Sequence, residues 1–143
     1  MIATKVPAYL KKEDGSVAPN GKRETILEYC EISLKLLNVE CIDLYYMHRM
    51  DTTTPIEETV GAFKELIMQG KIKAYGLSEV GPNTIRRANA VHPCAVSNNY
   101  QCVQEEWSLW SRDIETNGVL DVCRELGISI VAYSPLGRYE CLF

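Results

Sequence analysis

"IDLYYMHRMDTTTPIEETVGAFKELIMQGKIKAYGLS", residues 42–78, contains two apolar runs of strand length on either side of a helical pattern. One face of the expected helix carries apolar residues three and four positions apart: Ile56, Val60, Phe63 and Ile67. A capping box is predicted at its start, made by Thr54, Pro55 and Glu57. Gly70 supplies a left-handed residue that ends it. The stretch therefore predicts a strand, a helix and a second strand.

The same alternation of elements continues on both sides of this stretch. Further strands are expected at 1–6, 102–107 and 128–134, and further helices at 23–37, 82–90 and 116–126. The segment 7–22 is polar and rich in Gly and Pro, so it is predicted to be a surface loop. Because the strands are nearly continuous in apolar and β-branched residues, they indicate a parallel sheet covered by helices.

Two α/β architectures fit this order, a doubly wound sheet and a (β/α)₈ barrel. A complete barrel takes about 250 residues and eight strands. This chain has 143 residues, which predict one domain with a real core, and only five strand patterns. If the fold is a barrel, the chain forms part of one.

Composition excludes several classes of protein. The chain is 46% hydrophobic and 24% charged, which argues against disorder. The net charge is −4 and no Lys/Arg cluster is present, so nucleic-acid and membrane partners are not expected. No secretion leader follows Met1, and no apolar run reaches the roughly 18 residues of a membrane span. These features predict a soluble, cytoplasmic protein.

The cysteines favour thiols over disulfides. An even number of them could suggest a disulfide framework, but they lie far apart, several within helix or strand patterns. They are Cys30, Cys41, Cys94, Cys102, Cys123 and Cys141. Neither CxxC nor HExxH occurs, so no metal site is expected.

A polar or titratable residue closes every predicted strand. The five endings are Lys5, His48, Ser78 with Glu79, Gln104, and Tyr133 with Ser134. In either architecture the carboxyl ends of the strands share one edge, where ligands bind. Each residue also has a structural reading: Lys5 can be a solvated lysine, His48 a core-edge histidine and Tyr133 a packing residue. Together they indicate a shared site.

Several longer stretches resemble the aldo-keto reductase family, in particular its fungal and plant branch of pyridoxal- or perakine-reductase-like enzymes. The similar stretches are "IATK", "DLYYMHRMD", "PIEETVGAFKELIMQGKIKAYGLSEV", "TIRRANAVHP", "VQEEWSLWSRD" and "ELGISIVAYSPLGR". They cover most of the chain in the family's order. The resemblance implies a (β/α)₈ barrel of which residues 1–143 form one incomplete segment, roughly strands three to seven.

The resemblance also implies an activity, the reduction of aldehydes or ketones with NADPH. Lys5 and His48 match the lysine and histidine of the family's Asp–Tyr–Lys–His tetrad. Three residues match contacts to the nicotinamide carboxamide: Ser78, Glu79 and Gln104. Tyr133 matches the tyrosine that stacks on the nicotinamide. Three more fall in the loop that meets the pyrophosphate: Ser134, Leu136 and Arg138.

The chain departs from the family pattern in three places. No residue before "IATK" matches the family's Asp and Tyr, nothing matches strand eight, and residues 96–101 are inserted relative to the family's spacing. We therefore expect the isolated chain to be inactive, and to expose open barrel edges and an apolar inner face through which copies self-associate. Two other functions stay open: a non-catalytic nucleotide-binding remnant, and a lyase that forms a Schiff base through Lys5.

Overall fold

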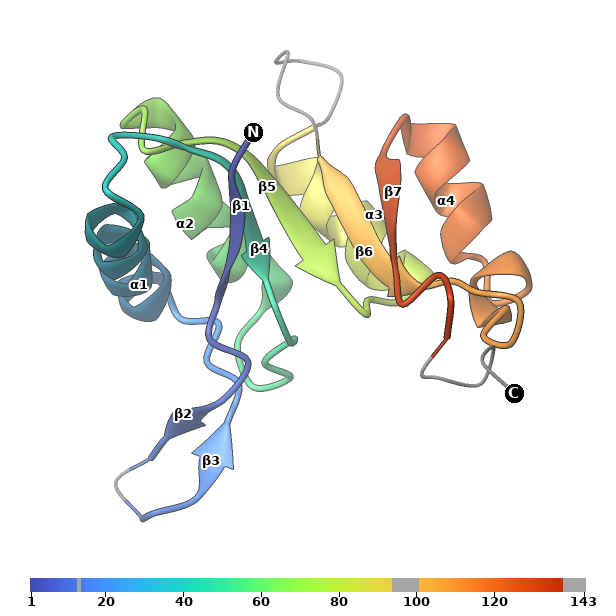
Figure 1. Ribbon diagram of the computed structural model, residues 1–143, viewed down its shortest axis with the longest axis horizontal. Coiled ribbons are helices and arrows are strands. Elements are labelled where there is room, and N and C mark those ends of the chain that lie inside the picture. Colours follow the sequence, from blue (N-terminus) through green and yellow to red (C-terminus); the bar gives the residue numbers. More distant parts are fainter. Residues whose placement is uncertain (13, 94–100, 138–143) are drawn as a thin grey trace.

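The computed structural model describes residues 1–12, 14–93 and 101–137 (Figure 1). Five strands form one parallel sheet, as predicted. In order across the sheet they are β1 (Ala3–Val6), β4 (Ile42–Met47), β5 (Ile72–Ser78), β6 (Cys102–Glu106) and β7 (Ser129–Tyr133). Because every neighbouring pair is parallel and consecutive, all five carboxyl ends lie along the same edge.

Four helices connect these strands. They are α1 (Arg23–Leu37), α2 (Ile56–Met68), α3 (Pro82–Val91) and α4 (Val119–Leu126). In Figure 1, α2 and α3 lie behind the sheet, with α1 and α4 towards its two sides. The main core lies between the helices and one face of the sheet, where Tyr45, Phe63 and Tyr75 are almost fully buried. Within the described ranges, no helix is long and apolar enough to traverse a lipid bilayer.

A second apolar cluster lies on the other face of the sheet. It consists of Leu44, Tyr46, Ala74 and Cys102, with Val131 against it. The first four are only 2–8% exposed, so the expectation of an exposed apolar inner face is wrong for these residues. The phenol ring of Tyr46 covers Gly76, and its hydroxyl oxygen lies 3.0 Å from the Cys102 sulfur. The Tyr46 side chain therefore reaches from β4 across β5 to β6.

Local structure differs from prediction at three points. The loop 7–22 contains a short hairpin, β2 (Leu10–Lys11) and β3 (Val17–Ala18). The predicted helix 116–126 begins only at Val119, after the 3₁₀ turn η1 (Asp113–Glu115) and the left-handed Gly118.

The predicted capping box at α2 is also wrong. Pro55 occupies the N-cap position of that helix, and no side chain caps it. The Thr54 hydroxyl donates instead to the Asp51 carboxylate at 2.7 Å. That carboxylate also accepts the backbone N–H groups of Gly21 and Thr53. The Thr54 side chain therefore stabilises the β4–α2 loop and does not cap the helix.

The contact between Tyr46 and β5 predicts a stability effect of Gly76→Ala. A Cβ at this position would lie 2.4 Å from the Tyr46 ring and 2.9 Å from the Cys102 sulfur, and both neighbours are buried. We expect the variant to lose about 2 kcal/mol of unfolding free energy, measured by urea denaturation.

Gly61→Ala is the matched control for this substitution. Gly61 lies within α2, and a Cβ there would meet nothing within 4 Å. Alanine should raise the unfolding free energy by about 0.5–1 kcal/mol, because it restricts the unfolded chain and favours the helix. Equal effects at the two glycines would contradict the proposed role of the Tyr46 contact.

Candidate active site

The residues predicted to form a site lie along the carboxyl edge of the sheet. Lys5 on β1 pairs in register with Tyr46, and His48 directly follows the last residue of β4. Because Met47 pairs with Leu77, His48 and Ser78 are the next residues on adjacent strands. Ser78 in turn pairs with Gln104, and Tyr133 ends β7 opposite Glu106. The strand register thus brings residues from five segments to one rim.

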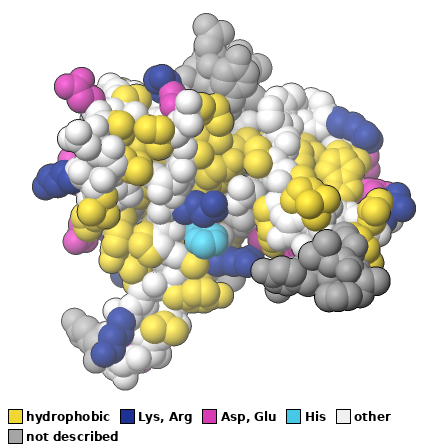
Figure 2. Space-filling model, in the orientation of Figure 1, with side chains coloured by type: hydrophobic (Ala, Val, Ile, Leu, Met, Phe, Trp, Pro, Cys, Tyr) yellow, Lys and Arg dark blue, Asp and Glu magenta, His cyan; other side chains and the backbone are white. Residues whose placement is uncertain are grey.

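The β1–β4 end of the rim is basic. The Lys5 ammonium nitrogen lies 5.3 Å from the centre of the Tyr46 ring, a cation–π geometry. Burial, and then the charges of Lys5 and Arg49, hold the pKa of His48 below its ordinary value. Figure 2 shows a histidine bordered by basic side chains on the face in front of the sheet. The lowered pKa favours the neutral imidazole of His48, which can donate one N–H bond.

The middle of the rim presents neutral polar groups. Ser78 is 3% exposed and Gln104 is half-buried, and the two are register partners on β5 and β6. The backbone N–H of Glu79, the residue after β5, donates to the Gln104 carbonyl at 3.1 Å. A hydroxyl and a carboxamide side by side offer both donors and acceptors, which is the chemistry needed to hold another amide.

The β7 end of the rim joins an aromatic ring to a carboxylate. The Tyr133 hydroxyl donates to Glu79 Oε1 at 2.7 Å. Burial and then this hydrogen bond raise the pKa of Tyr133 to about 12, so the phenol stays protonated near neutral pH. Glu79 itself has φ +57, in the left-handed region that few side chains adopt.

The turn after β7 carries the residues predicted to meet a pyrophosphate. Ser134 has φ +49, and its carbonyl accepts the Gly137 N–H at 2.9 Å. Leu136 is 77% exposed, and the Trp110 ring lies against Gly137. The third predicted residue, Arg138, lies outside the described residues.

Glu105 was not predicted, although it is buried just behind the rim. It is 8% exposed, and its Oε1 accepts the Val80 N–H at 2.9 Å. Burial is the main cause that raises its pKa to about 7; the nearby Glu79 adds to the rise and Arg49 opposes it. Strand alternation could have found it, since Gln104 and Glu106 face the rim and the residue between them faces the helices.

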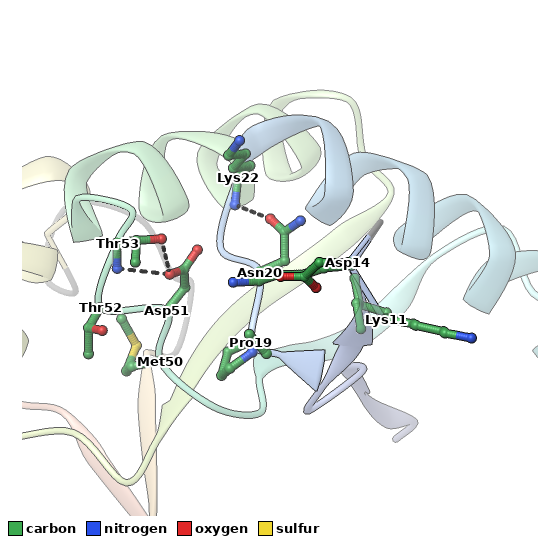
Figure 3. Close-up of a pocket in the computed structure, with 12 residues that line it drawn as sticks. Lys11, Asp14, Pro19, Asn20, Lys22, Met50, Asp51, Thr52 and Thr53 are labelled. Carbon is green, nitrogen blue, oxygen red and sulfur yellow. Dashed lines mark hydrogen bonds between the residues drawn. The ribbon is translucent and has the colours of Figure 1, made fainter. Parts of the chain in front are cut away.

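A cavity of about 720 Å³ lies next to this rim (Figure 3). It is lined by the β2–β3 hairpin and by Met50–Thr53 of the β4–α2 loop. None of the described residues predicted for the site is among its lining residues. It is a surface hollow that the Asp51 hydrogen bonds hold in shape.

Of the inserted segment 96–101, only Gln101 is among the described residues. Gln101 is buried, with its side-chain amide donating to the His92 carbonyl. Over residues 1–12, 14–93 and 101–137, no three His, Cys, Asp or Glu side chains are grouped as metal ligands.

Comparison with known proteins identifies the family of this arrangement. The model of the aldo/keto reductase family matches residues 1–138. "Probable aldo-keto reductase 1" of Glycine max is 58% identical over 118 residues, which are 82% of this chain and 32% of that protein. The chain thus spans about a third of the length of this curated relative.

Solved structures confirm the fold. A glycerol dehydrogenase of Gluconobacter oxydans superposes with a TM-score of 0.78 at 29% identity, over 92% of this chain and 39% of that one. An aldo-keto reductase of Bacillus halodurans, solved in its holo form, gives a TM-score of 0.74 at 30% identity, over 92% and 41%. The prediction of a partial (β/α)₈ barrel is therefore confirmed.

The buried Glu105 predicts a pH dependence of stability. Its folded-state pKa of about 7 lies above its ordinary value of 4.5. The folded protein therefore binds more protons than the unfolded chain in this window, and stability falls as the pH rises through it. Urea unfolding should show a loss on the order of 2 kcal/mol between pH 4.5 and pH 7.

Glu105→Gln should flatten this dependence, because the amide keeps the acceptor for the Val80 N–H and cannot ionise. Glu28→Gln, on the exposed side of α1, removes the same charge elsewhere and should leave the slope unchanged. An unaltered slope in Glu105→Gln would show that another group titrates.

Proposed function

Because this chain belongs to the aldo/keto reductase family, we propose that it supplies the lysine, the histidine and the nicotinamide contacts of an NADPH-dependent carbonyl reductase. The observation that carries the proposal is the line of polar side chains along one edge of the sheet. Aldo-keto reductases act on small carbonyl compounds and use a nicotinamide cofactor. The proposal extends these properties to this chain and specifies NADPH.

In this proposal, the basic end of the rim binds the carbonyl substrate. When bound, the nicotinamide supplies the hydride. The arriving hydride places negative charge on the carbonyl oxygen, so fixed donors and positive charge at that oxygen lower the barrier. The neutral imidazole of His48 donates an N–H to this oxygen, and the Lys5 ammonium adds a positive field. Lys5 is held over the Tyr46 ring, which orients it before substrate arrives.

The rest of the rim is proposed to hold the cofactor. The Ser78 hydroxyl and the Gln104 amide match the donors and acceptors of a carboxamide, which is why these side chains fit the nicotinamide. The Tyr133 ring provides a flat face for stacking. The pyrophosphate is assigned to the turn after β7, with Ser134, Leu136 and Arg138.

Two finer assignments accompany this proposal. Membership of the fungal and plant branch is supported by the 58% identity with the Glycine max relative. A cytoplasmic location is supported by the thiols of the described cysteines Cys30, Cys41, Cys102 and Cys123, which suit a reducing compartment.

NADPH titration of the 143-residue chain tests the function. The family's Asp and Tyr have no counterpart among these residues. We expect NADPH fluorescence to change on binding, while turnover with an aldehyde panel stays about 10²–10⁴-fold below that of a complete relative, the usual contribution of a general acid. Ser78→Ala should weaken binding.

Ser129→Ala, at the opposite end of the sheet, is the matched control and should bind as the wild type does. Lack of NADPH binding by the wild-type chain would overturn the proposed function. Steady NADPH oxidation would support a reductase and overturn the expected inactivity.

We also propose that copies of the chain associate through the flanks of the sheet. Within the part of the chain that the structure describes, β1 and β7 are the two edge strands. Large apolar side chains are exposed beside both: Ile32 and Leu36 on α1, and Leu109, Trp110 and Leu136 near β7. Glu31 pairs with Lys71, which follows α2, so the side of α1 that carries Glu31 faces α2. Leu36 comes five residues after Glu31, and the helical repeat places it on the other flank of α1, turned away from α2.

Leu36→Lys should reduce this association, because a lysine on the flank opposes apolar contact. Met68→Lys is the matched control: the two side chains are 81% and 80% exposed, and Met68 is the last residue of α2, the helix between β4 and β5. Sedimentation velocity should show a smaller species only for Leu36→Lys. A wild-type chain that stays monomeric at high concentration would contradict the proposal.

A further inference from the structure

The residue that follows β5 has an unusual backbone. Glu79 adopts φ +57, whereas most side chains avoid this region because Cβ crowds the following carbonyl. Its N–H remains bonded to the Gln104 carbonyl at 3.1 Å. The Glu79 peptide is therefore bonded to β6 at the end of its own strand. This bond and the contacts of the Glu79 side chain hold the strained conformation.

The Glu79 side chain continues the ladder between β5 and β6. In a regular parallel ladder, each bonded residue uses both of its backbone groups. Its N–H donates to a carbonyl on the neighbouring strand, and its own carbonyl accepts the N–H of the residue two positions further along that strand. The carboxylate takes the place of this carbonyl, because Oε1 accepts the Glu106 N–H at 3.2 Å. With this left-handed backbone, the Glu79 side chain replaces the backbone carbonyl as the last hydrogen-bond acceptor between β5 and β6.

The same oxygen reaches the next strand. Oε1 also accepts the Tyr133 hydroxyl at 2.7 Å, and Tyr133 is the register partner of Glu106. One carboxylate oxygen therefore joins the end of β5 to the backbone of β6 and to the side chain of β7. A bond to an ionised acceptor is stronger than a neutral one.

From this geometry we infer that Glu79 is a positioning residue, which orients the Tyr133 ring for the cofactor through the phenol hydroxyl. The inference rests on the proposed function for the identity of the ligand, a nicotinamide dinucleotide. It gives Glu79 a role other than direct contact with the carboxamide, which is left to Ser78 and Gln104. The carboxylate fixes the far end of the ring, so the flat face is set before the ligand binds.

A double-mutant cycle on NADPH affinity separates the two roles. Glu79→Ala in the wild-type background should weaken NADPH binding about fivefold, the worth of one hydrogen bond. In the Tyr133→Phe background, where the hydroxyl is already absent, the same substitution should change affinity less than about twofold. A fivefold loss in both backgrounds would overturn the inference and assign Glu79 to direct cofactor contact.

Two further variants at Glu79 sharpen the test. Glu79→Gln retains an oxygen acceptor in the same place and should preserve most of the affinity. Glu79→Asp is one methylene shorter and should behave like Glu79→Ala, because it cannot span the distance from β5 to the Tyr133 hydroxyl. Equal affinities for the glutamine and aspartate variants would contradict a role that depends on reach.

A measurement without cofactor keeps this inference separate from the proposed function. The ring Cζ resonance of Tyr133 in ¹³C-tyrosine-labelled protein can be identified by its loss in Tyr133→Phe. Glu79→Ala should shift this resonance, and Glu79→Gln should shift it less. If the wild-type chain fails to bind NADPH, the proposed function fails while the resonance still reports the bond. An unmoved resonance in Glu79→Ala would overturn the positioning role.

Discussion

Parallel hydrogen bonding between consecutive strands is the constraint on which the rest of this structure depends. Each strand pairs with the next in one direction, so five carboxyl ends meet at one edge. Residues up to 128 positions apart, such as Lys5 and Tyr133, thereby line the same rim. The helices bury one face of the sheet, but they contribute no residue to the proposed site.

Basic and acidic side chains are distributed unevenly along the rim. Lys5, His48 and Arg49 lie at the β1–β4 end, while Glu79 and Glu106 lie at the β5–β7 end, with Glu105 buried behind them. Neutral Ser78 and Gln104 precede these acidic residues on β5 and β6. A group that gains negative charge is therefore favoured at the basic end. Two of the acidic side chains accept hydrogen bonds there: Glu105 accepts the Val80 N–H, and Glu79 accepts the Glu106 N–H and the Tyr133 hydroxyl.

The fold was predictable because its signals are local and periodic. The apolar spacing in α2, the left-handed Gly70 and the buried run of β4 each depend on a few neighbouring residues. The capping box failed because Thr54 had a competing partner, Asp51, which the pattern of cap residues does not reveal. The hairpin of residues 10–18 was missed because its strands have only two residues each, too few for any periodicity.

Sequence alone determined which residues stand at the strand ends, since the change from apolar to polar marks where each strand leaves the core. Only the tertiary structure decided how those ends act on one another. Tyr46 reaches over Gly76 to Cys102, and Glu79 reaches past β6 to Tyr133. Both contacts join strands that are distant in the chain, and each depends on register, curvature and one unusual backbone or side-chain position. The register and these positions exist only in the assembled sheet, where hydrogen bonding between strands determines which residues are neighbours.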